Sequence, residues 1–122
     1  MFSIKRLAKS FRDALRGLAF VFKSEQNFRI QILIAVIIMA AAAFFPLKAW
    51  EIILLMLLIL LVLLVEILNT AIEYFNDLLK PRLHHYVFII KDIMAGAVLL
   101  TSVVALMIGI IIFLPYFVNS LK

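Results

Sequence analysis

The chain has 122 residues, of which 67% are hydrophobic, and it carries a formal net charge of +5 with no cysteine. Soluble domains are roughly 45–50% apolar, so the composition excludes a soluble globular domain and predicts one small integral membrane domain. The lack of cysteine excludes a disulfide framework and thiol chemistry.

Residues 1–29 predict an amphipathic helix on the membrane surface. Apolar residues recur at three- and four-residue steps on one face: Leu7, Phe11, Ala14, Leu15, Leu18 and Phe22. Basic residues fall mainly on the other face: Lys5, Lys9, Arg12, Arg16 and Lys23. The pattern is typical of an interfacial helix attracted to anionic lipid, and it leaves open whether the helix is only an anchor or also gates a substrate site. We expect no signal peptide, because no small-residue cleavage site follows the first apolar run.

Three apolar runs follow, each about long enough to cross a bilayer. We place the spans at residues 30–47, at 50–69 with a helical extension to 79, and at 93–114. Prolines punctuate the runs: Pro46, Pro81 and Pro115. Because a proline inside a helix removes a hydrogen bond, we expect Pro115 to end the third helix. The predicted fold class is all-α, with a surface helix and three transmembrane helices in a single domain.

The basic residues predict the orientation. Lysine and arginine concentrate in cytoplasmic segments, so the strongly basic residues 1–29 place the N-terminus inside. Three crossings then put the C-terminus outside. The loop 77–92 holds several basic residues and the turn 47–51 holds only Lys48, which agrees with this orientation. We therefore expect a multi-pass protein of the cell inner (plasma) membrane.

The second span carries an acidic stripe, which we define as Glu66, Glu73 and Asp77. Glu66 follows an uninterrupted apolar run, Ile52 to Val65. At about 100° per residue, Glu73 lies about 20° from Glu66 around the helix and Asp77 about 20° to its other side. An ionisable group in lipid is costly and is by default a functional-site candidate.

Carboxylates on one face suggest a divalent-cation site. Magnesium prefers oxygen ligands, is often held by one or two carboxylates, and completes its shell with water and phosphate. The alternative is a polar patch that solvates the helix end, paired with Lys80 or Lys91, and this alternative is strongest for Asp77. Taken alone, Glu25 is a solvated residue before the first span. Lys91 either snorkels to lipid headgroups or neutralises phosphate.

Other cofactor motifs are missing from the sequence. His84 and His85 point in different directions on any regular element, so they make a poor metal pair, and no zinc motif supports them. The chain also has no Walker A loop and no Rossmann fingerprint, so nucleotide use would need an unconventional site.

The stretch Glu66-Ile-Leu-Asn69-Thr-Ala-Ile-Glu73, followed by Asp77, His84 and Lys91-Asp92, closely resembles the signature of a family. The family is that of the small bacterial membrane lipid kinases, which comprises the prokaryotic diacylglycerol kinases and the related undecaprenol kinases. The resemblance covers nearly the whole chain. It implies a homotrimer with composite active sites that neighbouring subunits share at the membrane–cytosol interface.

The resemblance also implies roles for individual residues. Glu66 resembles the general base that takes the proton of the lipid hydroxyl, and Asn69 the residue that orients it. Glu25 and Glu73 resemble the carboxylates that hold the Mg²⁺ of Mg-ATP. The remaining matches are nucleotide-side contacts or their supports: Arg6, Asp77, His84, Lys91 on phosphate, and Asp92.

The sequence departs from the family pattern in three places. Arg82 stands where many members carry glutamate, so a nucleotide contact there is not implied. Asp13 replaces a tyrosine that some members have near the nucleotide, and Ile89-Ile90 replaces smaller or more polar residues.

We therefore expect a kinase that transfers the γ-phosphate of Mg-ATP to the hydroxyl of a membrane lipid alcohol. The loop and the C-terminal segment Ile-Ile-Phe-Leu-Pro resemble the Gram-positive-type members of the family, and this resemblance favours undecaprenol, with diacylglycerol as the alternative acceptor. A non-enzymatic small membrane protein, such as a holin or an exporter that uses Glu66 as a proton relay, is the other class, but it does not explain Glu73, Lys91 and Asp92 at one depth. The expected partners are the bilayer, the lipid, Mg-ATP and further copies of the chain, with no nucleic acid.

Overall fold

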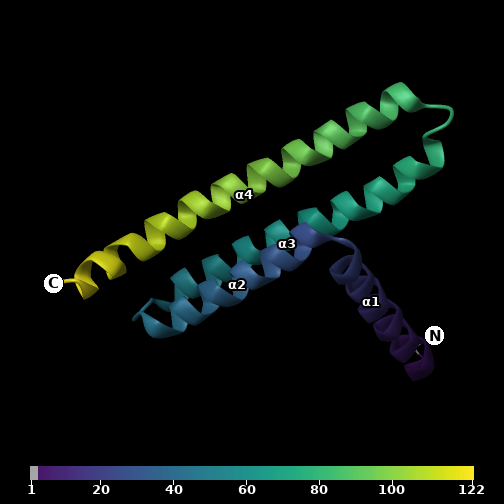
Figure 1. The fold of residues 1–122 in the computed structure, drawn as a ribbon. Coiled ribbons are helices and arrows are strands. Elements are labelled where there is room, and N and C mark those ends of the chain that lie inside the picture. Colours follow the sequence, from purple (N-terminus) through teal and green to yellow (C-terminus); the bar gives the residue numbers. More distant parts are fainter. Residues whose placement is uncertain (1–2) are drawn as a thin grey trace.

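A computed structural model describes residues 3–122, and within that range every regular element is a helix (Figure 1). The helices are α1 (Ile4–Ser24), α2 (Gln26–Phe44), α3 (Ala49–Leu79) and α4 (His84–Ser120). Helices α2, α3 and α4 are each long and apolar enough to cross a membrane. The all-helical fold class with three apolar spans is thus confirmed.

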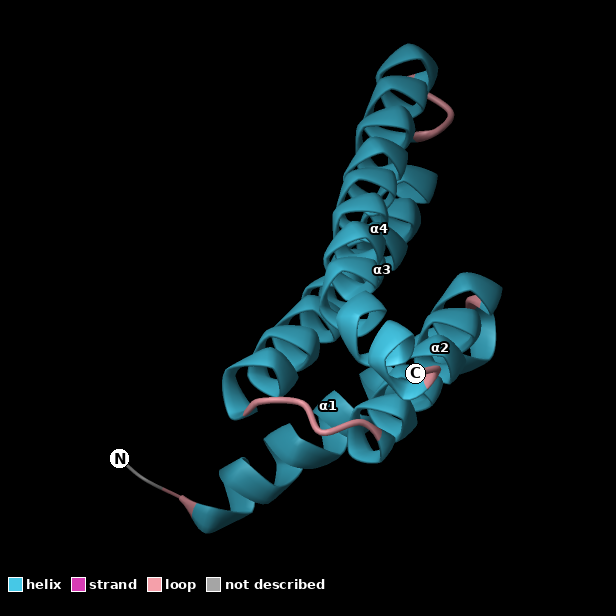
Figure 2. Cartoon of the chain, turned by 90° about the vertical axis from the view of Figure 1, so that its left-hand side faces the viewer, coloured by secondary structure: helices cyan, strands magenta, loops and turns pink. Residues whose placement is uncertain are grey.

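Helices α3 and α4 form a long antiparallel hairpin, and α2 runs beside α3 over the half of α3 that begins at its N-terminus (Figure 1). The turns between α2 and α3 and between α3 and α4 are short, so consecutive helices stay adjacent. Helix α1 leaves the bundle at a steep angle from the N-terminal end of α2, as two perpendicular views show (Figures 1 and 2). This position lets α1 lie in the interface while the other helices cross the bilayer.

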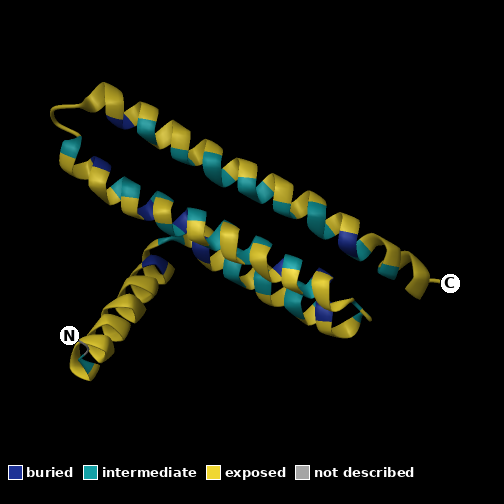
Figure 3. Ribbon diagram, turned by 180° about the vertical axis from the view of Figure 1, so that it is seen from behind, coloured by how far each residue is buried: buried dark blue, intermediate teal, exposed yellow. Residues whose placement is uncertain are grey.

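The small buried core lies toward the end of the bundle that holds the α2–α3 turn. Ala42, Leu55 and Ile112, one residue from each spanning helix, form its centre. Elsewhere most apolar side chains are exposed, for example Leu99 at 65% (Figure 3). Lipid tails are as apolar as these side chains, so the exposed faces incur no hydrophobic penalty in a bilayer.

Aromatic contact holds α1 against α3. The rings of Phe20 and Tyr74 meet edge to face with their centroids 5.2 Å apart. Val21, on the next position of α1, is buried. The C-terminal half of α1 is therefore fixed beside the part of α3 that carries the acidic stripe.

The expectation that Pro115 ends the last helix is wrong. Helix α4 continues through Pro115 to Ser120. The turn after the proline is tied to α3, because the Tyr116 hydroxyl donates a hydrogen bond to the Glu51 carboxylate. Glu51 also accepts from the backbone N–H of Lys48 at 2.9 Å. A proline removes only one hydrogen bond from the helix, and this tertiary contact helps to hold the turns that follow it.

Candidate functional site

The acidic stripe passes from buried to exposed along α3. Glu66 is 1% exposed, Glu73 is partly buried and Asp77 is exposed. The three lie on one face because they sit near multiples of the 3.6-residue turn. The acidic stripe therefore has a buried carboxylate at Glu66 and more exposed carboxylates at Glu73 and Asp77.

Glu66 has an unfilled hydrogen-bonding position. Its side chain faces Gln31 of α2. Both Glu66 Oε2 and Gln31 Oε1 are buried without a hydrogen-bond partner. Thr70 does not supply the missing donor, because its hydroxyl donates to the Glu66 backbone carbonyl at 3.0 Å. A buried polar group without a partner costs about 1–3 kcal/mol, so the free Glu66 oxygen is available to a donor from a ligand.

Glu25 and Glu73 form a carboxylate pair. The side chain of Glu25, between α1 and α2, lies within hydrogen-bonding reach of Glu73. Asn69 Nδ2 donates to Glu73 Oε1 at 3.3 Å, so within one chain it orients Glu73 and not, as the resemblance implied, Glu66. Burial raises the pKa of Glu25, and the negative charges of Glu73 and then Glu66 raise it further. Carboxylates that repel each other in this way are relieved by a cation placed between them.

Arg29 fixes the position of Glu25. Its Nη1 donates to the carbonyls of Phe22 and Lys23 at 2.8 and 2.9 Å. Carbonyls in the last turn of a helix have no partner within the helix, so Arg29 caps α1 from the first turn of α2. The chain turns sharply at Glu25, whose backbone is extended with φ −114° and ψ 111°.

The residues present suit Mg²⁺ bound together with a nucleotide. Within residues 3–122 no group of three or more Asp, Glu, His or Cys side chains could hold a metal ion alone. Magnesium does not need such a group, since one or two carboxylates with water and phosphate oxygens are sufficient. The Glu25–Glu73 pair would supply those carboxylates and leave the remaining positions to the nucleotide.

Of the predicted residues on α4, Lys91 and Asp92 stand at the height of Glu73 but apart from the carboxylates, and His84 is the first residue of the helix. Glu73 lies about 9 Å before the end of α3, and Lys91 about 10 Å after the start of α4. His84, Lys91 and Asp92 are exposed and, within residues 3–122, make no hydrogen bond or ion pair with the carboxylates. Asp92 lies about 160° around α4 from Ile112, which packs against α3. Asp92 therefore faces away from the stripe of its own chain.

Arg6 is also remote within one chain. It is exposed near the start of α1, where its backbone N–H donates to the Ser3 hydroxyl at 3.4 Å. About 28 Å of helix separates it from Glu25. One chain thus brings together Glu25, Glu66, Asn69 and Glu73, and leaves the other predicted contacts outside this group.

Sequence reasoning missed Gln31 and the role of Arg29. The signal for Gln31 was an amide inside a run that is otherwise apolar, which is uncommon in a lipid-facing span. Arg29 is one of the basic residues within residues 1–29, and nothing in the sequence pattern sets it apart from the others. Its part in capping α1 depends on a bend at Glu25 that no periodicity predicts.

Comparisons with known proteins agree with these features. Residues 12–113 match the family described as prokaryotic diacylglycerol kinase. A diacylglycerol kinase of Synechocystis sp. is 38% identical over 110 residues, which cover 89% of this chain but 63% of that protein. An undecaprenol kinase of Bacillus subtilis is 35% identical over 112 residues, which cover 92% of this chain and 91% of that protein. The chain thus spans less than two thirds of the first relative and nearly all of the second.

Proposed function

Because the chain belongs to the prokaryotic diacylglycerol kinase family and is an ATP-dependent lipid kinase, we propose that its acceptor is the hydroxyl group of undecaprenol. Diacylglycerol is the alternative acceptor. Undecaprenol is favoured because the match to the Bacillus subtilis undecaprenol kinase extends over 91% of that protein.

The observation that carries the proposed chemistry is the buried, unpartnered oxygen of Glu66. A general base must lie within reach of the proton that it removes, and Glu66 Oε2 is a buried acceptor without a hydrogen-bond partner. Glu73 lies about 10 Å farther along α3, toward water. A lipid hydroxyl at Glu66 and a nucleotide phosphate at Glu73 would then meet between the two.

Phosphoryl transfer demands positioning and charge neutralisation more than covalent chemistry. In the proposed reaction the lipid oxygen attacks the γ-phosphorus of ATP, and the bond to the β–γ bridging oxygen breaks. Glu66 takes the hydroxyl proton and ADP leaves. Asn69 holds Glu73 in place, and the apolar surroundings of Glu66 keep out water that would compete as acceptor.

Glu25 and Glu73 would hold Mg²⁺, which when bound neutralises phosphate charge. We assign Lys91 to the phosphates, since its long side chain stands at the height of Glu73. Arg6, His84 and Asp92 complete the nucleotide contacts, with Asp77 as support. Asp92 faces away from the acidic stripe of its own chain. These assignments therefore require a homotrimer in which neighbouring subunits contribute residues to each site.

The proposed topology puts this site at the cytosolic face. The protein spans the bacterial inner membrane with its N-terminus inside and its C-terminus outside. The support is the distribution of basic residues, which gather in residues 1–29 and in the α3–α4 turn. ATP then arrives from the cytosol and the lipid arrives laterally from the bilayer.

Radiolabelled ATP tests the proposal directly. The purified protein in mixed micelles receives Mg²⁺, labelled ATP and either undecaprenol or diacylglycerol. We expect label chiefly in undecaprenyl phosphate. Faster labelling of diacylglycerol would show that diacylglycerol is the preferred acceptor, while the lipid-kinase activity itself would stand. No labelled lipid from either acceptor, with folding intact, would favour the non-enzymatic class.

A further inference from the structure

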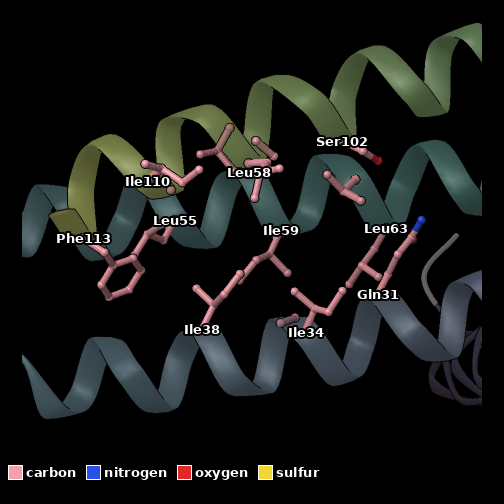
Figure 4. A pocket seen from close by; sticks show the side chains of 15 residues that line it. Gln31, Ile34, Ile38, Leu55, Leu58, Ile59, Leu63, Ser102, Ile110 and Phe113 are labelled. Atoms are coloured by element: carbon pink, nitrogen blue, oxygen red, sulfur yellow. The ribbon is translucent and has the colours of Figure 1, made fainter. Parts of the chain in front are cut away.

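Asn76 is a buried amide on α3 that the chemistry described above does not use. The residue is 4% exposed, and its Oδ1 is buried without a hydrogen-bond partner among residues 3–122. The interior between the spans is otherwise largely apolar, and the cavity among α2, α3 and α4 has Gln31 and Ser102 as its polar members (Figure 4). An unpartnered buried amide lowers stability, so Asn76 does not stabilise the packing in which it lies.

The contact at the other end of the α3–α4 hairpin indicates what Asn76 faces. There the Tyr116 hydroxyl of α4 donates to the Glu51 carboxylate of α3. Asn76 follows Glu51 by 25 residues, and Lys91 precedes Tyr116 by 25 residues. The helices are antiparallel, so equal steps along both keep the residues level, and each step is about 20° short of seven full turns. Asn76 and Lys91 therefore occupy, near the α3–α4 turn, the positions that Glu51 and Tyr116 occupy at the other end.

Lys91 has the direction and the donors to meet Asn76. Side chains of a helix lean toward its N-terminus, and α4 begins at the α3–α4 turn. Val87, one turn nearer that end, is buried, and Lys91 lies about 40° around α4 from it. Lys91 is exposed, and its ammonium group carries three donors and no acceptor. The lysine thus stands beside the amide with the donor that Asn76 Oδ1 lacks.

A nucleotide is a poor partner for this amide. Because Asn76 is buried on the side of α3 that packs on α4, a ligand would have to separate the two helices to reach it. The side chain of Lys91 comes from α4 itself and needs only a change of rotamer. Lys80, four residues after Asn76 on α3, is a second cation one helical turn away, and the test includes it.

We propose that Asn76 is a positioning residue that receives the Lys91 ammonium and holds it at the level where the phosphates bind. The proposal rests on the phosphate role proposed for Lys91 and adds what fixes that side chain. Glu73 lies about 4.5 Å before Asn76 along α3, so a lysine held at Asn76 stands near the level of the Glu25–Glu73 pair. A neutral amide orients the ammonium and leaves its positive charge for the phosphates, whereas a carboxylate would neutralise that charge.

A double-mutant cycle tests the proposal. Asn76→Leu keeps the branching of the side chain without its polar atoms, and it should not lower the unfolding temperature, because it removes an unpartnered buried amide. Calorimetry with Mg²⁺ and a non-hydrolysable ATP analogue should show an affinity about fivefold weaker, the ratio that one ordinary hydrogen bond gives. In the Lys91→Ala protein, which should itself bind more weakly, Asn76→Leu should have no further effect.

The matched control is Thr101→Val. It removes a partly buried hydroxyl of α4 that already donates to the Ala97 carbonyl at 2.9 Å, and it should leave the affinity for the analogue unchanged.

Amine labelling detects the contact without a nucleotide. The wild type and Asn76→Leu in detergent micelles receive an amine-reactive reagent, and mass spectrometry compares the labelling rate of Lys91 with that of Lys122. The loss of Asn76 should release Lys91 and raise this ratio about fivefold.

Three results would overturn the proposal. The first is an equal effect of Asn76→Leu with and without Lys91, and the second is an effect that Lys80→Ala removes and Lys91→Ala does not. The third is unchanged affinity and unchanged labelling in Asn76→Leu. If Lys91→Ala weakens binding and Asn76→Leu does not, the positioning role alone fails. If Lys91→Ala binds the analogue as the wild type does, the phosphate role of Lys91 fails, and the positioning role fails with it.

Discussion

Glu66 and Glu51 show how two buried carboxylates of one helix differ. Glu51 is 8% exposed and accepts hydrogen bonds from Tyr116 and from the Lys48 backbone. Glu66 is 1% exposed, and one of its oxygens has no partner. A satisfied buried carboxylate stabilises structure, whereas an unsatisfied one is ready to take a donor from a ligand.

This difference makes a residue-level prediction. Glu66→Gln should reduce lipid phosphorylation by at least about 100-fold, because general-base catalysis contributes roughly 10²–10⁴-fold. Nucleotide affinity should stay near that of the wild type, since Glu25 and Glu73 are untouched. Turnover with labelled ATP and nucleotide binding by calorimetry give the two values. Glu51→Gln is the matched control and should keep its turnover; near-normal turnover in Glu66→Gln would defeat the assignment.

At the scale of elements, two contacts decide where helices point. Arg29 joins the start of α2 to the last turn of α1. Tyr116 joins the end of α4 to the start of α3 through Glu51. The first contact sets the position of Glu25, and the second lies about 22 Å along α3 from Glu66. We therefore expect the first to affect catalysis and the second to affect stability.

Arg29→Ala should raise the Mg²⁺ concentration needed for half-maximal activity. Without the guanidinium, the end of α1 loses its cap and Glu25 is no longer held beside Glu73. We expect a rise of about tenfold, equivalent to about 1.4 kcal/mol. Arg29→Lys should recover part of the loss, because an ammonium group also donates to carbonyls.

The control for this variant is Arg16→Ala on the same helix. Arg16 forms an exposed ion pair with Asp13 at 3.7 Å, and such pairs contribute little. If Arg29→Ala lowers thermal stability but leaves the Mg²⁺ dependence unchanged, Arg29 is only structural and the positioning role is wrong.

Tyr116→Phe should lower the free energy of unfolding, because it removes a hydrogen bond to a charged group. The KM for ATP should not change at this distance from the site. Unfolding in detergent micelles measures the first quantity. Tyr86→Phe, at an α4 position that is 60% exposed, is the control. Equal unfolding energies for the two variants would show that the tie to Glu51 does not hold the end of α4.

At the scale of the whole molecule, the sequence predicted what depends on one helix at a time. Long apolar runs predicted the spans, and helical periodicity placed Glu66 and Glu73 on one face. The sequence could not predict that Gln31 faces Glu66, because this contact depends on how α2 packs on α3. Pro115 was misjudged for a similar reason, since a tertiary contact from Tyr116 supports the helix beyond it.

The last prediction concerns sites shared between subunits. Asp92 faces away from the stripe of its own chain, so in the proposed trimer it serves the site of a neighbour. Glu66→Gln and Asp92→Asn should each be inactive alone. When the two variants are expressed together in equal amounts, a site works if one subunit supplies Glu66 and its neighbour supplies Asp92, which random assembly gives for about one quarter of the sites. Labelled-lipid formation by the co-purified proteins measures the recovery, and doubly mutated chains mixed with wild type provide the calibration. If the mixture stays inactive, Asp92 acts within its own chain, and α4 must turn to bring it to the carboxylates.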